Sequence, residues 1–233
     1  MMALKAVLLA AGKGTRLRPL TDRVPKVMVP INGKPVLQYH IEGLAKHGIR
    51  DIIINLHYLP DVIRAYFSDG SKWGVKIQYS LEPEILGTAG AVKNLEPSLA
   101  GAPFLVVYGD NILDIDYKEF ARISKARDGL GTIAVFELED VSGSGIVEIG
   151  EGDRILQFVE KPKPEEVFSH WVNAGVFWFN PRIFEHLPSG FSDFSFDIFP
   201  RLLERGEQLF AYKLGIKVLA IDHYDLLNRV LES

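Results

Sequence analysis

The first residues that could do chemistry lie close together near the start of the chain. Gly12 and Gly14 let a ligand approach the backbone closely and free main-chain N–H groups to point at an anion. Arg16, Arg18 and Lys26 follow with three positive charges. A guanidinium fork and an ammonium suit the oxygens of a polyphosphate. The pattern predicts a triphosphate-binding loop, and the alternative is a glycine turn followed by a basic surface loop.

The glycine pair alone does not decide between these interpretations. It lacks the third glycine of the dinucleotide fingerprint and the Gly-Lys-Ser/Thr ending of a P-loop. The apolar run at residues 4–9 predicts a strand buried on both faces that leads directly into the loop. Pro19, Pro25 and Pro30 predict a loop that is extended rather than helical.

Asp110 is the second residue with chemical potential, because it follows an apolar run at residues 104–108 that predicts another buried strand. In open α/β sheets, ligands bind beyond the carboxyl ends of the strands. A carboxylate there, beside a phosphate loop, could hold Mg²⁺, which prefers oxygen ligands. The alternative is a turn cap, which aspartate commonly supplies.

The elements that must position these residues alternate between strand and helix in the first half of the chain. This order predicts an α/β fold, a three-layer α/β/α sandwich with a mostly parallel, Rossmann-like mixed sheet. Strands are expected at residues 4–9, 51–56, 75–79 and 104–108, and helices at 36–47, 61–67, 88–95 and 117–127. The second half is richer in strands, expected at 132–138, 145–149, 155–160 and 172–179, with a loop from 193 leading into a helix at 195–205.

Composition narrows the function further. A chain of 233 residues with 47% hydrophobic residues predicts a single domain, 1–233, whose pattern of elements changes near residue 130. The net charge of -4 argues against a general nucleic-acid binder. The absence of cysteine excludes disulfides and thiolate metal sites. No leader or membrane-spanning run is recognised, so a cytoplasmic protein is expected.

The longer string around the glycines carries a resemblance to a known family. Leu-Ala-Ala-Gly-Lys-Gly-Thr-Arg-Leu, then Pro-Leu-Thr and Pro-Lys, resembles the nucleotide-binding motif of the sugar-1-phosphate nucleotidyltransferases. The resemblance implies catalytic roles for Arg16, Lys26 and Asp110. It also implies that the nucleotide is bound by the loop residues Ala10, Ala11, Gly12, Gly14, Thr15 and Arg16.

A second string, Glu-Pro-Glu-Ile-Leu-Gly-Thr-Ala-Gly-Ala-Val, resembles the segment that meets the base in this family. It implies that Glu82, Gly87 and Thr88 bind the nucleotide, whereas a plain turn with Thr88 as helix N-cap is the alternative. A carboxylate only accepts hydrogen bonds, and guanine offers N1–H and N2–H₂ side by side. Glu82 therefore favours GTP over UTP or dTTP, unless the backbone reads the base instead.

The resemblance implies a nucleotide-binding half at 1–130 and a sugar-phosphate-binding half at 131–233, and three further motifs lie in the second half. Gly145 in Ser-Gly-Ser-Gly-Ile-Val-Glu, the pair in Glu160-Lys161-Pro162, and Asn173 in Asn-Ala-Gly resemble the segments that contact the sugar phosphate, and Asn111 is assigned with them. An exposed strand-end pair and an ordinary strand are the alternative interpretations.

The metal ligands and the partners follow from the same resemblance. Gly-Asp-Asn resembles the family's metal-binding motif at Asp110, and an ungapped match makes Asp222 the second Mg²⁺ ligand, whereas a gapped one points to Asp225. The expected reaction joins a nucleoside triphosphate to a sugar-1-phosphate and releases pyrophosphate, with GTP and mannose-1-phosphate favoured. The alternatives are a glucose-1-phosphate thymidylyl- or uridylyltransferase, a cytidylyltransferase of a phosphorylated alcohol, or a non-catalytic NDP-sugar-binding subunit. No C-terminal β-helix domain is expected, and a homodimer is left open.

Overall fold

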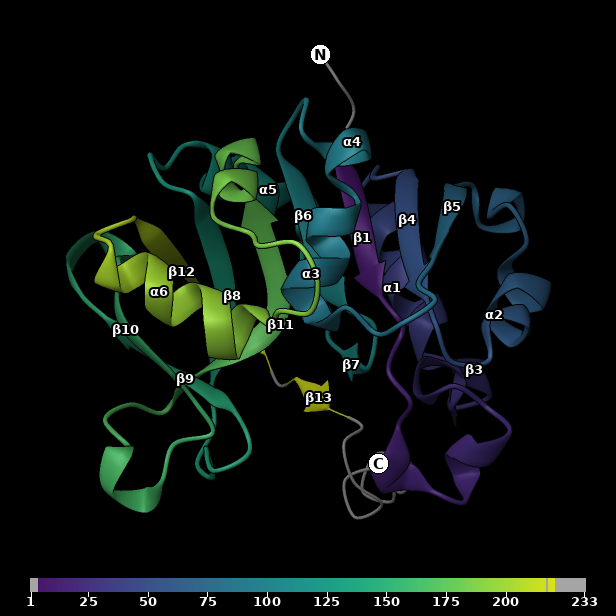
Figure 1. Ribbon diagram of the computed structural model, residues 1–233, viewed down its shortest axis with the longest axis horizontal. Coiled ribbons are helices and arrows are strands. Elements are labelled where there is room, and N and C mark those ends of the chain that lie inside the picture. The colour runs from purple at the N-terminus through teal and green to yellow at the C-terminus, as the bar shows by residue number, and fades with distance from the viewer. Residues whose placement is uncertain (1–3, 217, 221–233) are drawn as a thin grey trace. The chain divides into compact units, whose positions relative to one another are not determined.

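The computed structural model describes residues 4–216 and 218–220 (Figure 1). These residues form two compact units. Each unit is built from separate segments of the chain. Unit 1 contains residues 4–85, 107–118 and 218–220, and unit 2 contains residues 86–106 and 119–216. Strand β6 (Phe104–Tyr108) and helix α5 (Tyr117–Lys125) are shared between them. A single domain with halves that meet at residue 130 stays a prediction.

The sheet of unit 1 is parallel. Strands β1 (Lys5–Leu9), β4 (Asp51–Leu56) and β5 (Lys76–Leu81) lie side by side in that order (Figure 1). Helices α1 (Val36–Lys46) and α2 (Pro60–Phe67) are the crossovers between them. The middle of β1 is fully buried, as expected for a strand covered on both faces. The bond from the backbone N–H of Gly109 to the carbonyl oxygen of Leu9, at 3.0 Å, places the residues after β6 beside the end of β1.

The segment after β1 differs from the sequence prediction. It is not extended but contains three short 3-10 turns, at Thr15–Leu17, Leu20–Asp22 and Lys26–Met28. Pro19 and Pro25 lie immediately before two of these turns. Proline fixes φ near −65°, a value that suits the start of a helical turn as well as extended chain. The prolines therefore precede short turns and do not keep the loop extended.

The smaller elements of unit 1 complete its frame. Strands β2 (Pro30–Ile31) and β3 (Lys34–Pro35) form a short hairpin. Strand β7 (Asn111–Ile112) pairs with β13 (Leu219–Ala220). Among the described residues of the chain, no helix is both long and apolar enough to cross a lipid bilayer.

Unit 2 contains a mixed sheet. Strand β8 (Gly131–Glu137) pairs parallel with β12 (Leu209–Lys213) and antiparallel with β11 (Trp171–Phe179). Strand β9 (Gly145–Ile149) pairs with β11 and with β10 (Ile155–Glu160). Helices α3 (Gly87–Asn94) and α4 (Glu96–Leu99) follow one another in this unit. The predicted class, an α/β sandwich with a mostly parallel, Rossmann-like mixed sheet, is confirmed, although β12 was not predicted.

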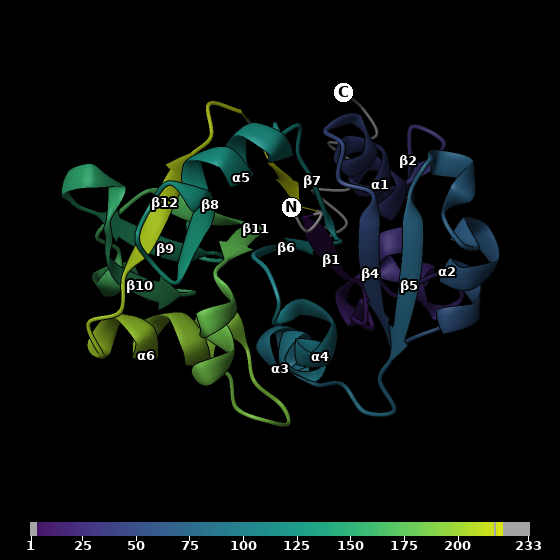
Figure 2. The same ribbon diagram turned by 90° about the horizontal axis from the view of Figure 1, so that it is seen from above.

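The helix expected at residues 195–205 is broken in two. A π-helical turn, Phe194–Ile198, precedes α6 (Phe199–Glu204), which packs on β10 (Figure 2). Pro200 explains the break, because inside a continuous α-helix its ring would clash with the carbonyl four residues earlier. Phe194 anchors the π-helical turn by stacking on Phe179, with ring centroids 5.0 Å apart.

Candidate functional site

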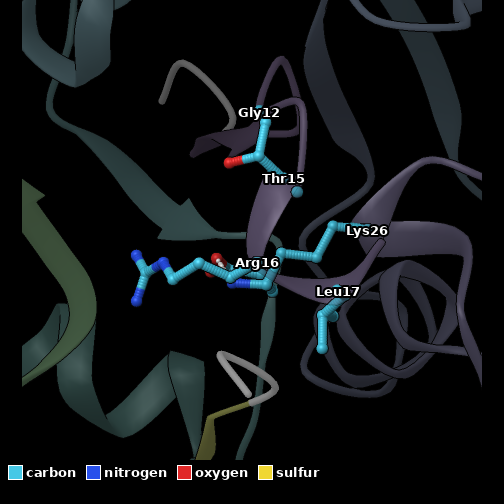
Figure 3. Close-up of a pocket in the computed structure, with 7 residues that line it drawn as sticks. Gly12, Thr15, Arg16, Leu17 and Lys26 are labelled. Atoms are coloured by element: carbon cyan, nitrogen blue, oxygen red, sulfur yellow. Dashed lines mark hydrogen bonds and ion pairs between the residues drawn. The ribbon is translucent and has the colours of Figure 1, made fainter. Parts of the chain in front are cut away.

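A pocket in unit 1 gathers most of the residues predicted to bind phosphate (Figure 3). It is lined by Gly12, Gly14, Thr15, Arg16, Leu17, Lys26 and Asp110. Leu17 is fully buried, and Arg16 extends its guanidinium away from the loop (Figure 3). Backbone groups of the loop and the side chains of Lys26 and Asp110 therefore line the same hollow.

Gly14 is required by the shape of this loop. Its φ of +61° is left-handed, and a Cβ there would lie 2.9 Å from the Cβ of Lys26. The hydroxyl of Thr21, a fully buried residue, donates to the carbonyl oxygen of Gly14 at 2.7 Å. The loop thus folds tightly against the Lys26 segment. Thr21 was not singled out in the sequence, although it lies in the Pro-Leu-Thr part of the motif.

Lys26 and Asp110 form an ion pair at the pocket wall. Lys26 Nζ lies 2.7 Å from Asp110 Oδ2, and the two side chains are 12% and 33% exposed. The structure therefore brings together two predicted residues that are 84 positions apart in the sequence. A pair that is partly shielded from water interacts more strongly than one on an open surface.

Behind Asp110, a buried histidine packs in unit 1. His40 of α1 is 2% exposed, and its Nδ1 lies 3.3 Å from the hydroxyl of Tyr117. Burial lowers the pKa of His40 to about 4, against the opposing influence of the Asn111 backbone and of the Asp110 charge. The imidazole is therefore neutral at neutral pH. Asn111 itself is half-buried in β7, where it pairs with Ala220.

Glu82 and Ala10 are linked through a residue that sequence reasoning missed. Glu82 is 2% exposed, and its Oε1 accepts a hydrogen bond from Asn55 Nδ2 at 2.8 Å. Asn55 Oδ1 in turn accepts from the backbone N–H of Ala10 at 2.7 Å. Ala11, the next loop residue, is also buried. The available signal was that Asn55 interrupts the isoleucine-rich run of β4 with a polar side chain.

In unit 2, the start of α3 is held by residues 190–194. Gly87 has a φ of +75°, and a Cβ there would collide with the carbonyl oxygen of Ser192. That oxygen accepts the N–H groups of Ala89 and Gly90, at 3.0 and 3.2 Å. The first turn of α3 is therefore closed by a loop that lies far along the chain from it.

Thr88 is part of the same clasp. Its hydroxyl donates to Asp193 Oδ2 at 2.9 Å and accepts the N–H of Phe194 at 2.8 Å. The N-cap position of α3 is Leu86, so Thr88 is not the cap. Contact of Gly87 and Thr88 with a nucleotide stays a prediction.

Three residues assigned to the sugar phosphate meet where β9 and β10 pair. A Cβ on Gly145 would lie 2.5 Å from Glu160 Oε2, so the glycine leaves room for this carboxylate. Lys161 has a left-handed φ of +50°, its N–H donates to the carbonyl oxygen of Ser144 at 3.0 Å, and its Nζ lies 5.8 Å from the centre of the Phe196 ring. The strands thus place a carboxylate and an ammonium on neighbouring residues beside a glycine.

Asn173 shapes an irregularity in β11. Its Oδ1 accepts the N–H of Gly175 at 2.8 Å, and Gly175 has a φ of +73°. The pairing of β11 with β8 shifts register between Asn173 and Phe177. The side chain therefore stabilises a local bulge, a device that re-aims side chains next to functional sites.

For a divalent metal, unit 1 offers Asp110 at the pocket. A carboxylate oxygen is the ligand type that Mg²⁺ prefers, and Mg²⁺ commonly uses one or two carboxylates together with substrate phosphates and water. Asp110 fits that pattern. Within residues 4–216 and 218–220, no group of three or more potential ligand side chains is found. Asp222 and Asp225 lie outside the described residues.

The fold and this pocket define an α/β protein with a pocket formed by the loop after its first strand. Comparison with known families makes this specific, because the model of the family described as Nucleotidyl transferase matches residues 5–217. The chain therefore belongs to the nucleotidyl transferase family.

Individual relatives agree with this family. The chain is 35% identical to UTP--glucose-1-phosphate uridylyltransferase of Synechocystis sp., over 98% of the chain and 63% of the relative. It is 36% identical to mannose-1-phosphate guanyltransferase of Saccharomyces cerevisiae, over 91% of the chain and 59% of the relative. The crystal structure of HddC from Yersinia pseudotuberculosis complexed with GMP-PN superposes with a TM-score of 0.82 at 28% identity, covering 98% of both chains. The chain thus spans about three fifths of the length of these curated relatives.

Proposed function

We propose that this chain transfers a nucleotidyl group from a nucleoside triphosphate to a sugar-1-phosphate. A phosphate oxygen of the sugar-1-phosphate attacks the α-phosphorus, a new P–O bond forms, and the bond from the α-phosphorus to the bridging oxygen breaks. Pyrophosphate leaves with that electron pair, and the product is an NDP-sugar. The observation that carries the proposal is the unit 1 pocket, where a glycine loop, Arg16, Lys26 and Asp110 converge. A charged reaction of this kind needs positioning and charge stabilisation more than covalent help.

In unit 1, each pocket group has a role that its chemistry supports. The backbone around Gly12, Gly14 and Thr15 cradles the triphosphate. Arg16, whose guanidinium can bind two phosphate oxygens, stabilises the β- and γ-phosphates and the leaving pyrophosphate. Lys26 lies at the pocket wall beside Asp110, where it can neutralise charge that develops during transfer.

Asp110 is proposed to hold Mg²⁺, with Asp222 as the second ligand. When bound, Mg²⁺ withdraws charge from the phosphate oxygens and fixes their orientation. Asp110 orients its carboxylate through the ion pair with Lys26, so the same pair sets the spacing between the ammonium and the ligand oxygen.

Unit 2 is proposed to recognise the second substrate. Glu160 accepts hydrogen bonds from sugar hydroxyls, Lys161 holds the phosphate of the sugar, and Gly145 keeps space for both. The juxtaposition of Gly145 with the Glu160 carboxylate supports this division. Asn173 contributes through the bulge that it stabilises in β11.

For the substrates, we propose GTP and mannose-1-phosphate. Several curated relatives are mannose-1-phosphate guanyltransferases, and the HddC structure holds GMP-PN. The Glu82 carboxylate favours guanine because a carboxylate accepts hydrogen bonds and guanine offers two adjacent donors. Glu82 is 2% exposed, which leaves little surface for contact with a base. The uridylyltransferase relative supports UTP with glucose-1-phosphate as the second candidate. Because nucleoside triphosphates are the substrates, we propose a cytoplasmic location and leave a homodimer open.

The test is pyrophosphate release by the whole chain in the presence of Mg²⁺. GTP, UTP, dTTP, CTP and ATP are crossed with mannose-, glucose- and N-acetylglucosamine-1-phosphate. We expect activity with GTP and mannose-1-phosphate, lost when Mg²⁺ is removed with a chelator and restored when it is returned. Activity with UTP or dTTP and glucose-1-phosphate would overturn the substrate proposal but keep the reaction.

The remaining outcomes separate the other functions. Activity with CTP and a phosphorylated alcohol, such as phosphocholine, would show that the second substrate is not a sugar phosphate. Binding of an NDP-sugar without pyrophosphate release in any combination would show a non-catalytic binding protein and overturn the proposal. Retention of Arg16, Lys26 and Asp110 around one pocket argues against that outcome.

A further inference from the structure

Strand β4 contains a buried polar side chain that the proposed reaction does not use. Asn55 is 2% exposed and follows three buried isoleucines. Burying an amide costs free energy unless its donors and acceptors find partners. Asn55 has a partner on each side, Glu82 and the backbone N–H of Ala10.

The chemistry of the two partners fixes the orientation of the amide. The backbone N–H of Ala10 can only donate, so the group that faces it must be Asn55 Oδ1. Oε1 of Glu82 accepts a hydrogen bond, and the donor that faces it is Asn55 Nδ2. Both requirements are met by the same rotamer, at 2.7 and 2.8 Å. The side chain cannot flip without breaking both bonds.

Ala10 is the first residue after β1, where the phosphate loop begins. Its N–H points at Asn55 Oδ1 and is therefore committed to the protein interior. Glu82 is itself anchored, because its backbone N–H donates to the carbonyl oxygen of Leu56 at 2.7 Å. A chain of hydrogen bonds thus connects the residue after β5 to the origin of the phosphate loop.

We infer that Asn55 is a positioning residue for nucleotide binding. Clamped by the Glu82 carboxylate, it holds the Ala10 N–H inward and so sets the direction in which the loop leaves β1. Glu82 consequently acts on the phosphate loop through Asn55, in addition to any contact with a base. The effect on catalysis rests on the proposed function, but the hydrogen-bond relay does not.

The relay can be broken and rebuilt with isosteric changes. Asn55→Asp puts a carboxylate oxygen where Nδ2 was, opposite the Glu82 carboxylate, and two like charges at that separation repel. Glu82→Gln keeps an oxygen that can accept from Asn55 Nδ2, so the relay survives. In the double variant, the new amide at position 82 donates to the new carboxylate at position 55, whose other oxygen accepts from Ala10. Donor and acceptor are then exchanged, and the relay is restored.

The direct readout is hydrogen exchange at the Ala10 amide in the whole chain, measured without substrate. We expect Asn55→Asp to speed exchange at Ala10 by tenfold or more, Glu82→Gln to change it less than threefold, and the double variant to return it close to the starting rate. Amides of β11 in unit 2 are the control, because a general loss of stability would speed them as well. If Asn55→Asp does not fold, recovery of a folded protein by the double variant still tests the relay.

The second readout is steady-state kinetics with the active substrate pair. Asn55→Asp should raise KM for the nucleoside triphosphate about tenfold, with a smaller change in KM for the sugar phosphate, and recovery in the double variant is judged by exchange at Ala10 alone. Unchanged exchange at Ala10 in Asn55→Asp, or no recovery in the double variant, would overturn the relay. If the unmodified chain shows no transfer at all, the proposed function fails while the exchange measurement still decides the relay.

Discussion

The loop at residues 10–26 of unit 1 and the residues of unit 2 proposed to bind the sugar phosphate are built by different means. Side chains from distant segments fix the loop: Thr21 binds the Gly14 carbonyl, Asn55 binds the Ala10 N–H, and Lys26 pairs with Asp110. The cluster of Gly145, Glu160, Lys161, Asn173 and Gly175 depends instead on backbone conformation. Two of its members, Lys161 and Gly175, have positive φ.

This difference matches the ligands that the two regions are proposed to bind. A polyphosphate presents many equivalent oxygens, and fixed N–H groups and cations suit it without fine adjustment of each contact. A sugar presents hydroxyls whose directions distinguish one sugar from another. A bulge or a left-handed residue points side chains in directions that the regular alternation of a strand does not provide.

The largest effect should come from the cations of the phosphate pocket. Lys26→Ala and Arg16→Ala should each lower kcat by about 10²- to 10³-fold, the loss typical when a group that stabilises transition-state charge is removed. Steady-state pyrophosphate release checks this. Lys34→Ala is the control, since Lys34 pairs with Glu42 away from the pocket and should change turnover less than twofold. Near-normal turnover in both pocket variants would contradict the proposed roles.

The buried His40 should make unit 1 sensitive to acid. Its pKa is about 4 in the folded chain because of burial, against an ordinary value near 6.5, so between these values the unfolded chain binds the extra proton. Stability should therefore be fully present above about pH 6.5 and fall as the pH is lowered towards 4, by about 2 kcal/mol between pH 7.5 and 5. Asp110 and Tyr117 are the neighbouring titratable groups.

Urea unfolding at the two pH values, in metal-free buffer, measures this effect. In His40→Gln the glutamine carries no titratable group, so the pH-dependent part attributed to His40 should vanish even if the variant is less stable overall. The same pH dependence in both proteins would show that other groups are responsible.

Gly145 offers a sharper test of unit 2, because the neighbouring Gly143 is a matched control. A Cβ at residue 145 would lie 2.5 Å from the Glu160 carboxylate, whereas one at residue 143 meets nothing within 4 Å. Gly145→Ala should raise KM for the sugar-1-phosphate about tenfold, the size of one displaced hydrogen bond, and leave KM for the nucleotide nearly unchanged. Equal effects of the two substitutions on KM for the sugar-1-phosphate would show that Glu160 does not take part in sugar recognition.

Replacing Lys161 by glycine should have the smallest effect, and it should increase stability while weakening binding of the sugar phosphate. A left-handed conformation is strained for lysine but not for glycine, so Lys161→Gly should raise Tm by about 2–4 °C, equivalent to roughly 1 kcal/mol for a chain of this size. It should nevertheless raise KM for the sugar phosphate, because the ammonium is lost. Asn32→Gly, at a φ of +51°, is the control and should not change either KM. A fall in Tm for Lys161→Gly would show that the lysine contacts outweigh the strain.

The bounds of several strands could be predicted well where apolar residues dominate the segment. The bounds expected for residues 51–56, 104–108, 145–149 and 155–160 are those observed. Such runs are buried on both faces or bounded by turn residues, so their limits are visible in the sequence. Strand β12 is short and follows a predicted helix, and only its pairing with β8 identifies it.

The residues of the candidate site likewise fall into those that could be predicted from the sequence and those that could not. Gly12, Gly14, Arg16, Lys26 and Asp110 were found from residue type and resemblance, and the structure places them around one pocket. Thr21 and Asn55 were missed because their roles depend on backbone groups that fold next to them, and the polar interruption of β4 at Asn55 does not by itself name its partners. The π-helical turn at Phe194–Ile198 was missed because periodicity does not distinguish it from an α-helix.

The interleaving of the two units has a consequence for synthesis of the chain. Unit 1 draws on residues 4–85, 107–118 and 218–220, and the intervening 86–106 belong to unit 2. A ribosome that has released the first 85 residues has delivered β1, β4 and β5 but not Gly109, which bonds to the end of β1, or Asp110. The nascent phosphate loop must therefore wait for its acidic partner. Unit 1 is therefore completed late in synthesis, although most of its residues precede those of unit 2.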